Sequence, residues 1–386
     1  MIGQRLGRCR VGEQKKGGLE MKRPGVLAPV SMLIGLAILA AITIGTMAAN
    51  TQSGSGGTRA DVKFDHVHFM VRDLDKAMKS YEELLSLTPT GNGGFKRDTE
   101  GSRIGMLPMH GGRVELIELF PSAPDSRMSR FVKEHGEGVG GFCIFLQDFD
   151  KEIAALQKKG IAVQVTNPPA TKDVKYPFRL GWVEADQAHG AWIEFVDVKT
   201  IPPSERNWDI AGKTRPARSF DHVHFIVKNL DAALKTYEKL LGLTPSGKGG
   251  FRRDFQGGRI GMLPLHGARI EMVEPSPGND RMYRFLKERG EGIGGFSIFV
   301  EDFDKEIEGL KRKGIPVQVM TTPILDPKNP LRLGWVEANR GHGVWLELAD
   351  VKTVPPFDKD WDVAFDAAPP ALWEHRFGWR GLRISD

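Results

Sequence analysis

The sequence predicts an α+β fold that arises by tandem duplication of one domain. The hexapeptide FDHVHF at residues 64–69 returns at residues 220–225, and the tetrapeptide GMLP at residues 105–108 returns at residues 261–264. The offset of about 155 residues is the size of a domain and far exceeds the period of a solenoid repeat. Within each copy, strand and helix patterns follow one another twice in the same order. The chain therefore carries four units of strand, helix and further strands.

The first unit begins with an alternating strand at residues 65–71. Asp73 then caps a helix that extends to about Leu85, because apolar residues recur there at helical spacing. Glycine-rich turns follow this helix. Alternating strands are predicted after them, at about residues 103–108 and 113–119.

The second unit repeats this order. It has an apolar strand at residues 141–146 and a helix from Asp148 to about Lys159, and Gly160 ends that helix. Three further strands are predicted at about residues 162–166, 179–184 and 191–196. Short helices at residues 128–134 and 282–289 connect the two units of each copy.

These patterns divide the chain into seven parts. They are a basic N-terminal segment (residues 1–25), an apolar segment (26–49), a linker (50–62), the first domain (63–200), a connector (201–218), the second domain (219–353) and a C-terminal extension (354–386). The connector and the extension share a Trp-Asp pair, which begins at Trp208 and at Trp361. Each is therefore expected to pack against its own domain.

The apolar segment at residues 26–49 predicts that the rest of the chain is exported to the periplasmic or extracellular side. It is long enough to cross a bilayer as a transmembrane helix, and the basic residues before it stay in the cytoplasm. A second interpretation is a signal peptide that starts at Met21 and is cut near Ala48 or Ala49. A third, a buried helix of the fold, is disfavoured because a Ser/Gly linker follows. Only the uncleaved helix would make the membrane a partner.

Composition and charge argue against other classes of protein. Of 386 residues, 40% are hydrophobic and 27% are charged, which is typical of globular proteins. The net charge of +5 lies partly before residue 24, and no basic stripe is interleaved with aromatic residues, so nucleic acid is not expected as a partner. The two cysteines, Cys9 and Cys143, lie on opposite sides of the apolar segment. No disulfide within the exported part is therefore expected.

Four units of this order resemble the vicinal oxygen chelate superfamily, which includes glyoxalase I, methylmalonyl-CoA epimerase, extradiol dioxygenases and the bleomycin-resistance proteins. The resemblance covers about residues 64–198 and 220–351. The local likeness is to methylmalonyl-CoA epimerase, and its motifs lie at residues 65–67, 74–77, 114–118, 136–139 and 192–195. Such a pattern is specific for the fold and weak for the reaction, because this scaffold hosts many chemistries.

The resemblance implies two tandem domains after the N-terminal apolar helix, each of two βαβββ modules that form a curved mixed sheet around a cavity. It also implies a divalent metal ion (Zn, Fe, Mn, Ni or Co), held by the first and last strands of each module. The implied ligands are His66, Glu115, residue 141 and Glu194 in the first domain, and His222, Glu271, residue 295 and Glu347 in the second. Gly141 and Gly295 replace the usual third-strand histidine.

The residues themselves offer a substitute ligand. His66 and His68 are two apart on a strand and project from the same face, so they form a workable chelate for one metal ion, and His222 and His224 repeat the pattern. The rival interpretation is a cavity without metal, in which the histidines form hydrogen bonds. Burial of two glutamates in one cavity then requires an arginine or a shared proton.

Candidate groups for proton transfer are Glu115, Glu194, Glu271 and Glu347, together with His189 and His342 at the turn before each closing strand. The alternative for the two histidines is an exposed or backbone-bonded position. The tryptophans at 192 and 345 are expected to lie in the core, on the opposite face from the glutamates.

Two functions remain open at this point. The first is a metal-dependent isomerase or lyase that acts on a small oxygenated molecule; loss of a histidine disfavours dioxygenase chemistry. The second is a metal-free protein that binds or sequesters a small molecule, as bleomycin-resistance proteins do. In either case the two domains are candidates for pairing with each other.

Overall fold

The computed structural model describes residue 59 and residues 61–90, 93–99, 101–121, 125–167, 178–206, 218–245, 251–253, 257–278, 280–323, 328 and 330–354. The apolar segment at residues 26–49, the linker as far as residue 58, both Trp-Asp pairs and the extension beyond residue 354 lie outside these ranges. Within them, no helix is both long enough and apolar enough to span a membrane.

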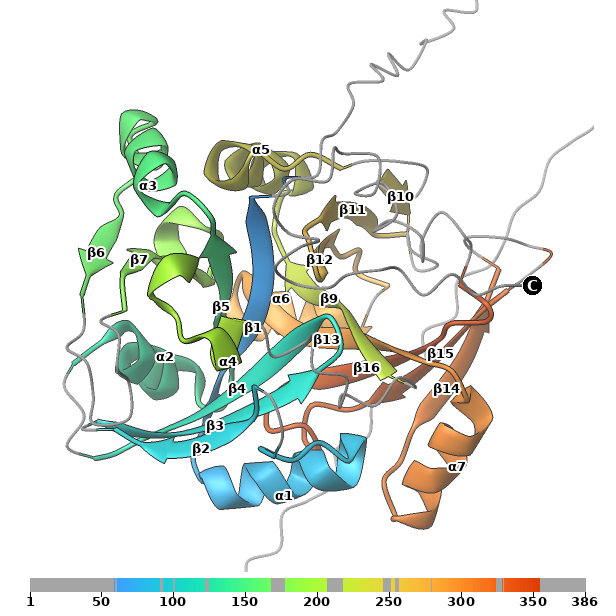
Figure 1. Ribbon diagram of the computed structural model, residues 1–386. Helices are drawn as coiled ribbons and strands as arrows, with labels where there is room; N and C mark the ends of the chain where they lie inside the picture. Colours follow the sequence, from blue (N-terminus) through green and yellow to red (C-terminus); the bar gives the residue numbers. More distant parts are fainter. Residues whose placement is uncertain are drawn as a thin grey trace, which may run out of the picture. The chain divides into compact units, whose positions relative to one another are not determined.

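The first copy follows the predicted order of elements (Figure 1). Its first module contains β1 (Val62–Val71), α1 (Leu74–Leu85), β2 (Phe95–Asp98), β3 (Ser102–Met109) and β4 (Gly112–Leu119). After α2 (Arg127–His135), the second module contains β5 (Gly138–Leu146), α3 (Phe149–Lys158), β6 (Gln164–Thr166), β7 (Leu180–Val183), η1 (Ala185–Gln187) and β8 (Trp192–Asp197), and η2 (Val198–Thr200) and α4 (Pro203–Arg206) follow. The sequence pattern did not predict β2 as a strand.

The second copy repeats the first. Its first module contains β9 (Arg218–Ile226), α5 (Leu230–Leu241), β10 (Phe251–Arg253), β11 (Arg259–Pro264) and β12 (Arg269–Glu274). After α6 (Asp280–Arg289) come β13 (Gly292–Val300), α7 (Phe303–Arg312), β14 (Gln318–Thr322), β15 (Leu331–Val336) and β16 (Trp345–Asp350).

Local chemistry explains where the first helix of each copy begins. The side chain of Asp73 accepts a hydrogen bond from the backbone N–H of Lys76, which confirms the predicted cap of α1. Asn229 caps α5 in the same way. Both helices end at a residue in the left-handed region, Ser86 and Gly242.

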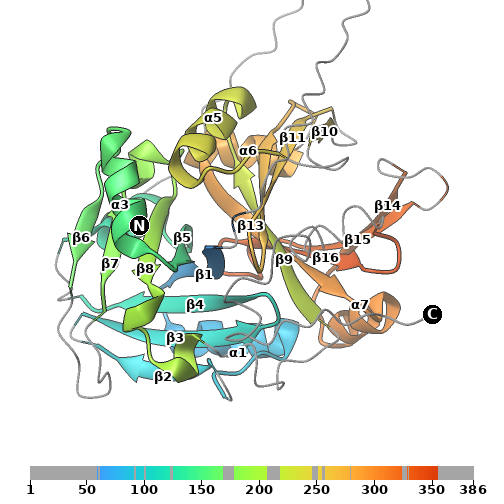
Figure 2. The same cartoon turned by 45° about the horizontal axis from the view of Figure 1, so that its top comes forward.

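The strands of the described residues join into one mixed sheet (Figure 2). In the first copy, β1 runs parallel to β4 and antiparallel to β5, and β5 runs parallel to β8. The pairing of β9, β12, β13 and β16 repeats this arrangement. The two modules of each copy are therefore joined along their first strands.

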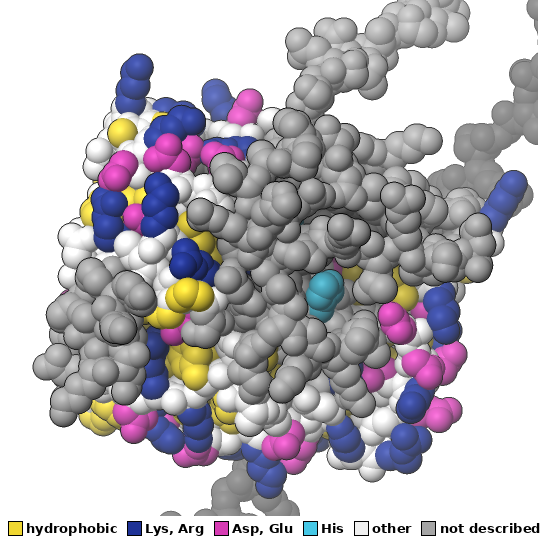
Figure 3. Space-filling view, viewed as in Figure 1, with side chains coloured by type: hydrophobic (Ala, Val, Ile, Leu, Met, Phe, Trp, Pro, Cys, Tyr) yellow, Lys and Arg dark blue, Asp and Glu magenta, His cyan; other side chains and the backbone are white. Residues whose placement is uncertain are grey.

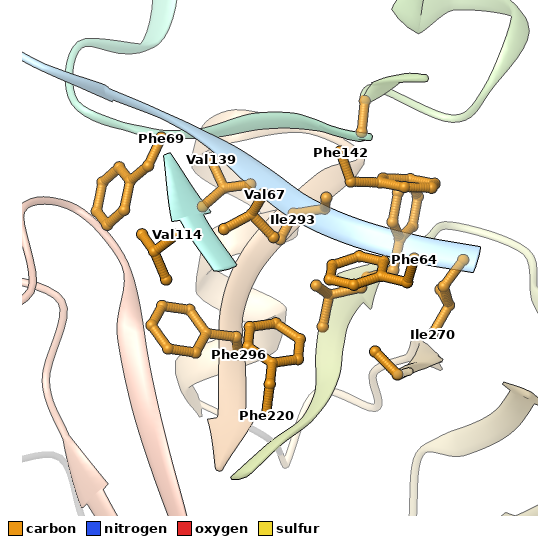
Figure 4. Packing of buried hydrophobic residues seen from close by; sticks show 14 of the residues in the cluster. Phe64, Val67, Phe69, Val114, Val139, Phe142, Phe220, Ile270, Ile293 and Phe296 are labelled. Atoms are coloured by element: carbon orange, nitrogen blue, oxygen red, sulfur yellow. The ribbon is translucent and has the colours of Figure 1, made fainter. Parts of the chain in front are cut away.

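The two copies pack against each other within the chain. One buried cluster includes residues of both copies, and strands β5 and β13 pair at Val139 and Ile293 (Figure 4). The ring of Phe220 lies 5.3 Å from that of Phe64 and 5.6 Å from that of Phe296. In each copy, one face of the sheet thus contributes to this shared core. The opposite face carries the candidate site. On the surface, basic and acidic side chains are interspersed over the described residues in the view of Figure 3.

Candidate metal centres

A bulge in the first strand places the two histidines of the first copy. The pairing of β1 with β5 shifts register between Phe64 and His66, and such a shift breaks the alternation of side chains. Phe64 therefore joins the core between the copies, whereas His66 and His68 both line a cavity. The residue at the bulge, Asp65, is fully buried.

Asp65 orients the first histidine. Nδ1 of His66 donates to Oδ2 of Asp65 at 2.6 Å, and the guanidinium of Arg113 donates to the same carboxylate. Burial opposes the charge on Asp65, but Arg113 outweighs it and keeps the pKa of that carboxyl below its usual range. Because Nδ1 donates to Asp65, the lone pair of Nε2 faces the cavity when the ring is neutral, as in histidines that a carboxylate holds toward a metal.

Two buried carboxylates face this nitrogen. Nε2 of His66 lies 3.3 Å from Oε2 of Glu115, on β4, and 3.7 Å from Oε2 of Glu194, on β8. Nε2 forms no hydrogen bond with any described residue. His66, His68, Glu115 and Glu194 together are called site 1. A ring nitrogen without a hydrogen bond between two carboxylates fits a bound cation.

The charges in site 1 depend on one another. Burial disfavours a charged His66, but the carboxylates of Glu115 and Asp65 outweigh burial and raise its pKa to about 10. Burial likewise disfavours a charged Glu115, and the nearby imidazolium lowers its pKa to about 2. Without a metal ion, His66 is therefore the cation that neutralises Glu115.

Site 1 lies in a cavity of about 240 Å³. Its walls are mainly apolar and include Ile104, Met106, Phe145 and Leu180, and Arg97 adds a positive charge. A cavity of this size is smaller than most ligand pockets.

Tryptophan occupies the place of the missing ligand. A Cβ atom at Gly141 would lie closer than 3 Å to the indole of Trp192, so no larger side chain fits there. The indole Nε1 donates to Nδ1 of His68 at 2.8 Å. The prediction that Trp192 points away from the glutamates is wrong, because residues two apart on a strand share a face, and Trp192 lies beside His68 on the face of Glu194. Trp345 covers Gly295 in the same way.

The second copy forms site 2 from His222, His224, Glu271 and Glu347. Nδ1 of His222 donates to Asp221 at 2.7 Å, and Arg269 binds Asp221 through two nitrogens, at 3.0 and 2.7 Å. Burial disfavours a charged His222, but Asp221 and then Glu271 raise its pKa to about 10.

The carboxylates of site 2 differ from each other. Burial opposes the charge on Glu271, but the two histidines outweigh it and hold its pKa well below the usual range. Burial raises the pKa of Glu347. Donor atoms of His222, His224 and Glu347 lie within 4.8 Å of one another, and the same holds for His66, His68 and Glu115. Both groups are consistent with a divalent metal site.

Comparison with known proteins now decides the family. The model of the glyoxalase/bleomycin resistance protein/dioxygenase superfamily matches residues 65–178 and 221–325. The chain belongs to this superfamily. The resemblance to the vicinal oxygen chelate proteins is thereby confirmed, with two domains of this fold. No curated protein is significantly similar to the chain in sequence.

Solved structures of other proteins are similar to the chain. A triple mutant of 4-hydroxymandelate synthase from Streptomyces coelicolor is 14% identical with a TM-score of 0.57, over 80% of this chain and 98% of that chain. Methylmalonyl-CoA epimerase from Mycobacterium tuberculosis is 24% identical over 36% of this chain and 91% of that chain, with a TM-score of 0.31. The local similarity to this epimerase is confirmed. At 14% identity the likeness to the synthase concerns the fold alone, and the reaction must be argued from the site.

The structure does not bring His189 and His342 to the superfamily cavity. Nδ1 of His189 lies 3.2 Å from Glu291 and Nε2 lies 3.1 Å from the hydroxyl of Thr236, both in the second copy. His342 makes the equivalent contacts with Glu137 and Ser80 of the first copy. Both histidines thus connect the two domains, and neither the exposed position nor the predicted place at the cavity mouth is observed.

Sequence reasoning missed the residues that support the candidate metal ligands. Arg113 and Arg269 lie two residues before Glu115 and Glu271, and each is buried against the aspartate that holds a histidine. Their recurrence at equal spacing in both superfamily domains was the available signal. Buried arginines of this kind are rarely left without a carboxylate.

Proposed function

We propose that the chain is a divalent-metal-dependent enzyme that transfers a proton on a small oxygenated substrate, with isomerase or lyase chemistry. The observation that supports this most is Nε2 of His66, which Asp65 orients toward two buried carboxylates. Burial of Glu115 beside Glu194 is costly unless a cation offsets the charge, and a metal ion would do so.

The residues present fit such an ion. Imidazole and carboxylate together suit Zn, Fe, Mn, Ni or Co, and His66, Glu115 and Glu194 would hold it in site 1. When bound, the ion supplies Lewis-acid stabilisation of negative charge on substrate oxygens. A carboxylate that binds through one oxygen keeps the other, so Glu115 and Glu194 are the candidate proton acceptors.

The cavity of site 1 would select and orient the substrate. Its mainly apolar walls strengthen charge interactions inside it. Arg97 lines the cavity. Its Nη1 lies 3.9 Å from Glu205, which is a long distance for an ion pair, so the guanidinium would also pair with an anionic substrate group. The small volume favours a substrate of few atoms.

Loss of both ligand sets tests the enzyme. We expect the purified chain to hold transition metal and to catalyse proton exchange on a small 2-oxo or 2-hydroxy acid, measured by loss of deuterium label. The double variant His66→Ala, His222→Ala is expected to lose both properties. Full exchange activity in that variant, or in chain stripped of metal by a chelator, would refute the proposal.

A second candidate is a metal-free protein that binds or sequesters a small molecule. The observation that favours it is the raised pKa of His66, about 10, because an imidazolium already neutralises Glu115. Ligand binding that a chelator leaves unchanged, with less than about 0.1 equivalent of metal after reconstitution, would support this function over the enzyme.

We also propose that the chain is exported across the cytoplasmic membrane by residues 26–49. The support is the apolar run and the basic residues that precede it. N-terminal sequencing of the mature protein distinguishes a signal peptide, cut near residue 49, from an uncleaved anchor. Full-length protein in the cytoplasmic fraction would refute export.

A further inference from the structure

We propose that sites 1 and 2 hold their metal through different donor sets, with one imidazole in site 1 and two in site 2, and that Cys143 and Ser297 determine the difference. This inference rests on the proposed function, because it concerns the same ion. It makes His68 a positioning residue and His224 a ligand, although the two occupy equivalent positions.

The contacts of His68 leave it no lone pair for a metal. An indole N–H can only donate, so Nδ1 of His68, 2.8 Å from Nε1 of Trp192, must accept. The proton of a neutral His68 is then on Nε2, which lies 2.8 Å from Oε2 of Glu194 and donates to it. A metal needs a free lone pair on a ring nitrogen. His68 therefore orients Glu194, and His66 is the single imidazole ligand of site 1.

His224 makes no such contacts with the tryptophan and the last-strand glutamate of its site. Its Nδ1 lies 3.1 Å from Oε2 of Glu271, whereas its Nε2 forms no hydrogen bond with a described residue, and the same is true of Nε1 of Trp345. Its ring makes an angle of 71° with the indole of Trp345, whereas the rings of His68 and Trp192 lie at 25°. The ring of His224 is thus turned relative to that of His68. When Nδ1 carries the proton and faces Glu271, the lone pair of Nε2 is available for a metal ion.

The neighbouring strand provides the cause. Cys143 on β5 is paired in register with Glu194, and Ser297 on β13 is paired in register with Glu347. The hydroxyl of Ser297 donates to Oε1 of Glu347 at 3.0 Å. A thiol is a weak donor, so in site 1 the carboxylate turns to His68 instead. One atom, oxygen or sulfur, thereby decides whether the second histidine is engaged by the glutamate.

Different donor sets imply different metal preferences. Imidazole suits Zn, Co and Ni, whereas carboxylate-rich sites suit Mn. Site 2 is therefore expected to prefer cobalt over manganese more strongly than site 1. Changes in groups that orient metal ligands alter affinity about 10–100-fold, so the ratio of cobalt to manganese affinity should differ between the sites by about tenfold or more.

Full-length variants with one intact site test this. His222→Ala with His224→Ala leaves site 1, and His66→Ala leaves site 2. Each is loaded with Co²⁺, and X-ray absorption spectroscopy counts the imidazole ligands. One imidazole in site 1 and two in site 2 are expected. Equal counts in the two sites would overturn this inference and leave the proposed function standing, whereas absence of metal from both would overturn both.

Reciprocal exchange provides the matched control. Ser297→Cys in the variant that keeps site 2 should reduce the count to one and lower cobalt affinity about tenfold. Cys143→Ser in the variant that keeps site 1 should raise the count to two. Trp192→Phe is a second route to the same increase, because it removes the indole donor. Unchanged counts in the folded exchange variants would show that Cys143 and Ser297 do not set the difference.

A measurement without metal separates the two claims further. Long-range ¹H–¹⁵N correlation spectra of the apo protein report which ring nitrogen carries the proton. His68 is expected as the Nε2–H form, and Trp192→Phe should remove that preference. A proton on Nδ1 of His68 in the unmodified protein would contradict the inference, whatever metal the chain binds.

Discussion

Sites 1 and 2 share their support and differ in their hydrogen bonds. In both, an aspartate next to the first histidine is buried against an arginine, and the aspartate fixes the histidine ring. The second histidine donates to a glutamate in site 1, whereas a serine holds the equivalent glutamate in site 2. The comparison shows that the two copies keep the same buried charges while the hydrogen bonds of the glutamate on the last strand differ.

The largest effect is expected where the two sites are alike. Arg113→Met or Arg269→Met leaves a buried aspartate without its guanidinium, which should lower the free energy of unfolding by about 3–5 kcal/mol. Urea denaturation of each variant measures this. Arg312→Met is the matched control, because its ion pair with Glu308 is 70% exposed on both sides, and its loss should cost under about 1 kcal/mol. If only one of the two arginine variants lost this much unfolding free energy, the two sites would not share the same support.

Restoring the superfamily histidine should fail. Gly141→His forces a side chain into the indole of Trp192 and should destabilise the fold by about 1–3 kcal/mol. Combined with Trp192→Ala, the same change should cost less, because the space is then open. Calorimetry measures the loss of stability that Gly141→His causes in the unmodified chain and in the Trp192→Ala variant. Equal destabilisation with and without Trp192 would show that the indole is not the obstacle.

The histidines between the domains should contribute equally. His189→Ala or His342→Ala removes two contacts with the other copy, at a cost of about 1–2 kcal/mol in unfolding free energy. Bound metal should not change, since neither residue lies in a site. Loss of metal or of activity without loss of stability would return these residues to a catalytic role.

The pH dependence of stability should be shared by both sites. His66 and His222 have pKa values near 10 in the folded apo protein, above about 6.5 in an unfolded chain. Their stabilising contribution is therefore full below pH 6.5 and is lost as the pH rises through about 10. Urea unfolding of the apo protein at several pH values should show this decrease, and His66→Gln with His222→Gln should remove most of it.

The sequence pattern predicted the order of strands and helices well, because periodicity and capping depend on residues that are near one another in the sequence. The strand and helix order, the cap at Asp73 and the convergence of His66, Glu115 and Glu194 follow from periodicity and from the superfamily resemblance. The bulge at Asp65 did not, because one extra residue in a strand leaves no periodic signal. The partners of His189 and His342 come from the other domain, and no local pattern encodes a contact between copies.

The sequence also did not predict the buried arginine–aspartate pairs, for a different reason. In the sequence, Arg113 is a polar residue on an alternating strand, and only the structure shows that it is buried with Asp65. Trp192 reads as core, and it is buried, but its indole N–H acts on His68. Burial of a polar group with its partner depends on packing in three dimensions, which composition and spacing do not specify.

The central claim is that imidazole and carboxylate side chains of each domain converge to hold one metal ion. Anomalous diffraction from crystals of the chain grown with Co²⁺ tests it most directly. The account predicts a peak next to Nε2 of His66, between Glu115 and Glu194, and a second peak next to His222 and His224. Crystals that contain cobalt elsewhere and show no peak in either position would contradict it.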